Sequence, residues 1–97
     1  MKLRFTPRAT ENIAAIADYI RSHNPTAAQH VRAAIYGSLQ NLILYPYVGR
    51  QQKAEGVRKL VIGKYFYLVY YTVDADAEEI IILNVKHPAQ QREHLDA

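Results

Sequence analysis

Three strand-like runs decide the fold: VRKLVI at Val57–Ile62, YFYLVYYTV at Tyr65–Val73 and EIIILNVKH at Glu79–His87. β-branched and aromatic residues dominate all three runs, as is typical of strands that pack on a core. The breaks between them, Gly63–Lys64 and Asp74–Ala77, are short. We therefore expect antiparallel strands joined by tight turns.

Two helix-like segments precede these runs, and the alternating stretch Lys2–Phe5 before them predicts a first strand. A capping residue followed by proline stands at the start of each segment, Thr6-Pro7 for the first and Asn24-Pro25 for the second. The predicted helices are Pro7–His23 and Pro25–Tyr45. Apolar residues recur at helical spacing in both: Ala9, Ile13, Ile16, Ala17 and Ile20 in the first, and Ala28, Val31, Ile35, Leu39 and Leu42 in the second.

The element order is thus β-α-α-β-β-β, which predicts an α+β fold with two antiparallel helices packed on an antiparallel sheet. No repeat or linker divides the chain, so we expect a single domain over residues 1–97. Tyr47–Gly56 has no periodicity and is expected to be an exposed loop. Ala89–Leu95 is a possible short C-terminal helix.

The last two strands are expected to have two apolar faces. In the central strand one face carries Tyr65, Tyr67, Val69, Tyr71 and Val73, and the other Phe66, Leu68, Tyr70 and Thr72. In the last strand Ile81, Leu83, Val85 and His87 share a face, and Ile80, Ile82, Asn84 and Lys86 share the other. Because two helices cover only one face of such a sheet, a partner or the chain's own C-terminus is expected to cover the other.

Composition excludes several classes of protein. The 97 residues are 49% hydrophobic, which suffices for one modest core, and include no cysteine. Disulfides, thiolate chemistry and cysteine-ligated zinc are therefore excluded. The N-terminus lacks the apolar region of a signal peptide, and no apolar run is long enough to span a membrane. We expect a soluble, cytoplasmic protein without a membrane partner.

Charge is distributed unevenly along the chain. The net charge is +3, and no Asp or Glu occurs between Tyr19 and Ala54, although that stretch holds Arg21, Arg32, Arg50 and Lys53. Such segregation favours an acidic partner, either a nucleic acid or an acidic protein segment. Ordinary solvated surface charge is the alternative.

The motifs of several enzymes are missing. The glycines are isolated, so no phosphate-binding loop is present, and the spacing of His23, His30, His87 and His94 does not suit a helical metal site. We expect no metal and no cofactor. Metal-free RNA cleavage needs a base, a cation and an acid. Arg58 is the candidate cation, and Glu55 or His87 the candidate base or acid. Alternatively, Arg58 pairs with an acid at the sheet edge and His87 caps the last strand.

The ordered set of motifs resembles the RelE/ParE toxins of type II toxin–antitoxin systems. The resemblance begins with Phe5–Ala9, which leads into a helix that ends at Ile16–Ile20. It continues with Leu42–Gly49, Val57–Val61, Tyr67–Val73 and Ile80–His87. It covers nearly the whole chain and implies a small toxin that a cognate antitoxin neutralises, the antitoxin wrapping the toxin as a helix and an added strand.

The resemblance implies two alternative activities. The ParE-like branch poisons DNA gyrase without a catalytic group. The RelE-like branch cuts messenger RNA on the ribosome, for which Glu55, Arg58 and His87 are the available set here. No tyrosine follows His87, and the long paired helices look more ParE-like, so we favour gyrase. A non-toxic nucleic-acid-binding module is a third hypothesis. The residues predicted to bind the target or the antitoxin are Arg50, Lys53, Arg58, Tyr67, Tyr71, Lys86, His87 and Arg92.

Overall fold

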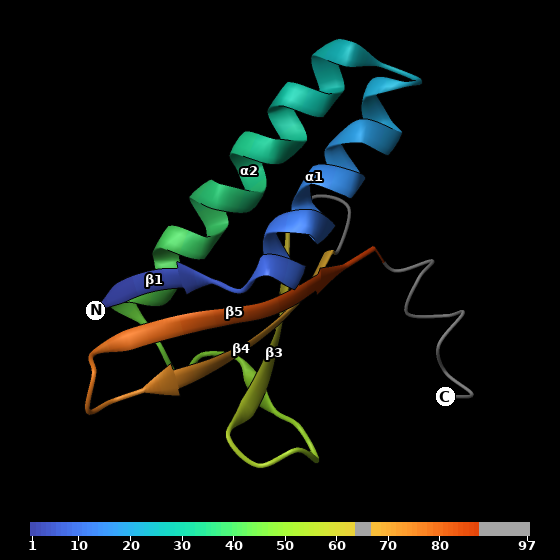
Figure 1. Ribbon diagram of the computed structural model, residues 1–97. Helices are drawn as coiled ribbons and strands as arrows, with labels where there is room; N and C mark the ends of the chain where they lie inside the picture. The colour runs from blue at the N-terminus through green and yellow to red at the C-terminus, as the bar shows by residue number, and fades with distance from the viewer. Residues whose placement is uncertain (64–66, 88–97) are drawn as a thin grey trace.

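The computed structural model describes residues 1–63 and 67–87, and two helices lie side by side against one face of its sheet (Figure 1). This confirms the α+β architecture. Along the chain the elements are β1 (Lys2–Phe5), α1 (Pro7–Arg21), α2 (Pro25–Leu44), β2 (Arg50–Gln51), β3 (Val57–Ile62), β4 (Tyr67–Asp74) and β5 (Glu79–Lys86). The possible terminal helix Ala89–Leu95 lies outside the described residues, as do Tyr65 and Phe66.

Both helices begin where the capping residues predict. The side chain of Thr6 accepts a hydrogen bond from the Ala9 amide at 3.1 Å, and that of Asn24 accepts one from the Ala27 amide at 3.1 Å. Each cap satisfies an amide that has no partner within its helix. The helices end two residues and one residue earlier than predicted, a difference typical of helix termini.

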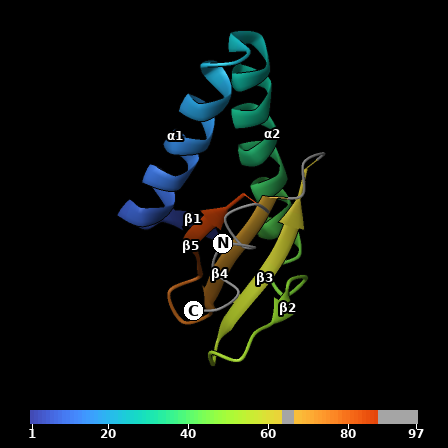
Figure 2. The same ribbon diagram turned by 90° about the vertical axis from the view of Figure 1, so that its right-hand side faces the viewer.

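The sheet has the strand order β1-β5-β4-β3-β2, and Figure 2 shows β5, β4, β3 and β2 following one another across it. The expectation of a wholly antiparallel sheet is wrong for β1, which pairs parallel with β5. No tight turn joins these two strands. The connection between them, residues 6–78, contains both helices and three strands, and a connection of this length permits the parallel direction. The predicted loop Tyr47–Gly56 also contains β2, which is too short to show any alternation.

The two faces of β4 are as expected, but those of β5 are not. Tyr67, Val69 and Tyr71 are buried against the helices, and from β5 they are joined by Ile80, Ile82 and Val85. The register explains this combination, because Tyr71 pairs with Ile82 and Tyr70 with Asn84, which leaves Leu83 as an extra residue. Such a β-bulge reverses the alternation.

The N-terminal part of α1 covers the edge of β5 beside the bulge. The Thr6 hydroxyl donates a hydrogen bond to the Leu83 carbonyl at 2.8 Å, and the Asn12 side-chain oxygen accepts one from the Val85 amide at 3.0 Å. Both backbone groups lie beyond the part of β5 that β1 pairs with. The helix thus replaces the missing strand partner at this edge.

Candidate functional site

The turn that follows α2 is held in place by several hydrogen bonds to its backbone. The Val48 amide donates to the Tyr45 carbonyl at 3.2 Å, which closes a turn with Pro46 and Tyr47 at its centre. Proline restricts the backbone at such a position. The turn then leads through Gly49 into β2.

Tyr71 holds this turn from the core. Its side chain is 0% exposed. Its hydroxyl donates a hydrogen bond to the Pro46 carbonyl at 2.9 Å and accepts one from the Gly49 amide at 2.8 Å. A β-carbon on Gly49 would stand 2.6 Å from the Tyr71 hydroxyl oxygen, so only glycine allows this approach.

Arg58 holds the same turn from the neighbouring strand, directly opposite Tyr71. Its guanidinium donates to the Tyr47 carbonyl at 3.1 Å and to the Gly49 carbonyl at 2.8 Å. Its central carbon also lies 5.1 Å from the centre of the Tyr47 ring, a cation–π contact. Within residues 1–63 and 67–87, the partners of Arg58 are thus two carbonyls and a ring, and not the acid that one alternative expected.

Burial raises the pKa of the Tyr71 hydroxyl above its ordinary value. The hydrogen bond from Gly49 and the charge of Arg58 act in the opposite direction but are the smaller effects. Tyr71 is therefore a neutral phenol at physiological pH. A neutral phenol both donates and accepts a hydrogen bond, as the turn requires.

The residues proposed for RNA cleavage do not converge. The His87 ring packs edge-on against Tyr67 with the ring centres 5.6 Å apart, whereas Arg58 pairs with Tyr71. Tyr67 and Tyr71 are four residues apart on β4, which corresponds to about 13 Å along a strand. Glu55 is exposed in the loop before β3. Arg58 and His87 therefore lie toward opposite ends of the sheet.

The other predicted binding residues are scattered over the surface and the core. Arg50 is exposed directly after Gly49, and Lys53 is exposed in the loop between β2 and β3. The Lys86 ammonium lies 5.5 Å from the centre of the Tyr70 ring. Tyr71 has no exposed side chain to offer a partner, so we reassign it from binding to support of the turn. Arg92 lies outside the described residues.

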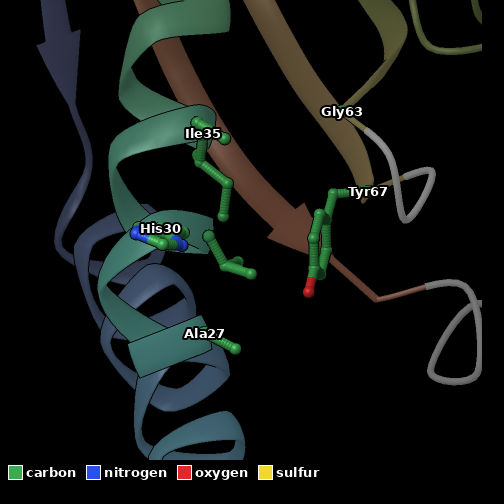
Figure 3. Close-up of a pocket in the computed structure, with 7 residues that line it drawn as sticks. Ala27, His30, Ile35, Gly63 and Tyr67 are labelled. Atoms are coloured by element: carbon green, nitrogen blue, oxygen red, sulfur yellow. The ribbon is translucent and has the colours of Figure 1, made fainter. Parts of the chain in front are cut away.

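An apolar pocket of about 240 Å³ lies between α2 and the start of β4. Figure 3 shows Ala27, His30 and Ile35 on α2, across from Tyr67 and Gly63. Val31 and Ala34 complete the described lining. Tyr67 is 3% exposed and forms one wall, so it contributes an aromatic surface to this pocket while belonging to the core. Sequence reasoning did not find this pocket because its two walls are distant in the chain, the nearest lining residues, Ile35 and Gly63, being 28 residues apart.

In the part of the chain that the structure describes, no three His, Cys, Asp or Glu side chains are grouped closely enough to hold a metal ion. None of the described helices is long and apolar enough to cross a bilayer.

Residues 3–92 match the family model described as the ParE toxin of the type II toxin–antitoxin system parDE. Among relatives, the putative toxin Y4kP of Sinorhizobium fredii is 34% identical over 90 residues, which are 93% of this chain and 91% of the relative. Toxin RelE2 of Caulobacter vibrioides is 31% identical over 86 residues, which are 89% of this chain and 93% of the relative.

Among solved structures, the chromosomal ParDE toxin–antitoxin system from P. aeruginosa has a similar chain. It superposes with a TM-score of 0.79 at 24% identity, over 90% of this chain and 95% of the other. At that identity the match supports the fold, and the family assignment rests on the sequence comparisons.

Proposed function

Since the chain belongs to the ParE toxin family of type II toxin–antitoxin systems, we propose that it arrests bacterial growth by binding DNA gyrase in the cytoplasm. In this proposal it needs no catalytic group and no cofactor. A cognate antitoxin neutralises it.

The observation that carries the non-catalytic proposal is that Arg58 hydrogen-bonds the backbone of the turn after α2. A cation that stabilises a phosphorane must direct its donors at the substrate. One terminal nitrogen of Arg58 instead donates to the carbonyls of Tyr47 and Gly49. The candidate acid or base His87 lies beside Tyr67, toward the other end of β4. This arrangement supports a scaffold role for Arg58.

The antitoxin proposal is supported by the acid-free stretch from Tyr19 to Ala54 and by the pocket beside α2. A concave apolar site of this size suits the apolar side chains of a docked helix. An acidic antitoxin segment would complement the basic residues of the acid-free stretch. The similar P. aeruginosa structure is that of a chromosomal ParDE toxin–antitoxin system.

The test is a supercoiling assay with purified DNA gyrase, run beside a translation-coupled messenger RNA cleavage assay. We expect inhibition of gyrase and no cleavage of RNA. RNA cleavage with gyrase unaffected would refute the proposal. His87→Ala is the informative variant, because His87 has a role in the nuclease alternative and lies far from the turn. We expect this variant to retain full toxicity.

A ribosome-dependent endoribonuclease is the second candidate, favoured by the 31% identity to Toxin RelE2. In that case His87→Ala reduces the cleavage rate by about 10²-fold or more, as is typical for loss of a general acid or base. Arg58→Ala separates the gyrase and endoribonuclease hypotheses less well, because the substitution also removes the hydrogen bonds that hold the turn.

A further inference from the structure

The end of α2 and the turn after it expose four large apolar side chains in five residues. Leu44 is 71% exposed, Tyr45 66%, Tyr47 55% and Val48 59%. Isolated exposed apolar residues are common on protein surfaces, but a contiguous group indicates an interaction site. We call Leu44–Val48 the apolar turn.

The backbone of the apolar turn is held in one position although its side chains point outward. Pro46, Tyr47 and Gly49 receive or donate the hydrogen bonds described above, and all of these bonds come from Tyr71 and Arg58. A segment held in this way loses little conformational entropy on binding. The apolar side chains are thus pre-organised for a partner.

The charges around the apolar turn indicate the chemistry of that partner. Arg50 and Lys53 are exposed two and five residues after it, and the nearest acids along the chain are Asp18 on one side and Glu55 on the other. A partner surface with an apolar centre and acidic groups at its rim complements this arrangement. The exposed aliphatic residues Leu44 and Val48 favour a protein over a nucleic acid, which binds aromatic residues by stacking.

The position of the apolar turn distinguishes it from the pocket proposed for the antitoxin. The pocket uses α2 residues from Ala27 to Ile35, whereas the apolar turn begins at Leu44, where α2 ends. An antitoxin segment in the pocket and a target protein at the apolar turn thus contact separate surfaces. We propose that the apolar turn is the anchor with which this toxin inserts into an acid-rimmed apolar pocket on its target protein. This inference rests on the proposed function and assigns it a contact surface.

The test compares two exposed tyrosines. Tyr45→Ser removes a side chain of the apolar turn, and Tyr19→Ser removes one that is equally exposed, at 69%, near the end of α1. Leu44→Ser and Val48→Ser extend the series. Binding of each variant to purified DNA gyrase holoenzyme is measured in solution, together with growth arrest on expression. Urea unfolding of each variant verifies that it is folded.

We expect Tyr45→Ser to weaken gyrase binding by about 10-fold or more, as is typical of a central interface residue, and Tyr19→Ser to change it less than twofold. Growth arrest should weaken in the same order. If folded Tyr45→Ser, Leu44→Ser and Val48→Ser all bind and arrest growth like the parent, the anchor is refuted.

Failure of the proposed function is distinguishable from failure of the anchor. If the parent arrests growth without binding gyrase, the gyrase proposal fails. Loss of arrest in Tyr45→Ser but not in Tyr19→Ser then still supports the anchor, with another target. A parent that neither binds gyrase nor arrests growth overturns both.

Discussion

Replacing Tyr71 by phenylalanine tests whether the core holds the apolar turn. The substitution keeps the buried ring and removes one oxygen, which donates to the Pro46 carbonyl and accepts from the Gly49 amide at 2.9 and 2.8 Å. Gly49 is itself buried, so its amide loses its partner without gaining free access to water.

The expected cost follows from these two bonds. Each contributes about 1 kcal/mol net, and leaving a buried donor without a partner raises the loss toward 1–3 kcal/mol for that group. We therefore expect Tyr71→Phe to lower the free energy of unfolding by about 2–3 kcal/mol. In urea this shifts the unfolding midpoint down by about 1–2 M with an unchanged slope.

The assay is equilibrium urea unfolding at 25 °C, followed by circular dichroism. Tyr19→Phe is the matched control, because its side chain is 69% exposed and its hydroxyl is free to exchange partners with water. We expect the control to change stability by less than about 0.5 kcal/mol. A loss of the same small size in Tyr71→Phe would show that the core does not hold the turn in this way.

Further predictions concern the same contacts and the edge of β5. Above pH 10.0, the unfolded chain loses the Tyr71 proton, whereas burial retains that proton in the folded protein. The unfolded state then binds fewer protons than the folded state, so the free energy of unfolding falls as the pH rises. The urea midpoint should therefore fall less steeply between pH 9 and pH 11 in Tyr71→Phe than in the parent. Gly49→Ala should destabilise the protein by about 1–3 kcal/mol because the added β-carbon meets Tyr71. Gly37→Ala lies within α2 and meets open space, so it should stabilise the protein by about 0.5–1 kcal/mol. Thermal melts compare the two variants, and equal effects would contradict the steric argument. Asn12→Ala should leave the Val85 amide without its partner and speed its hydrogen exchange, measured by NMR, while a retained protection factor would exclude this edge contact.

Local patterns predicted the elements of this fold well because their causes are local. Thr6 and Asn24 cap the helices through amides three residues away, so the signal lies within a few positions of the sequence. The alternation in β4 likewise identifies Tyr67, Val69 and Tyr71 as one face. The faces of β5 were mispredicted because a single extra residue, Leu83, reverses the alternation, and the bulge depends on pairing with β4.

The candidate site was less predictable, because its contacts join distant parts of the chain. Arg58 and Tyr71 were identified by residue type as binding or catalytic candidates, and the structure gives both the role of supporting the apolar turn. The sequence placed Tyr45 at a helix end and Tyr47 and Val48 in a loop. In such segments no periodic pattern of apolar residues shows which side chains are exposed. Only burial values distinguish them from core residues.

By itself, the sequence determined the number, type and order of the main elements, the absence of cysteine chemistry and the uneven charge, since these follow from composition and short-range spacing. The tertiary structure decided how they combine. β1 can pair parallel with β5 because the connection between them, residues 6–78, is long enough to leave the strand direction open. The orientation of Arg58 arises because two carbonyls of a turn 9 and 11 residues away are brought within reach of its guanidinium. A basic residue that sequence reasoning assigned to a substrate or partner therefore holds a turn of the protein itself, and the large apolar side chains of that turn are exposed.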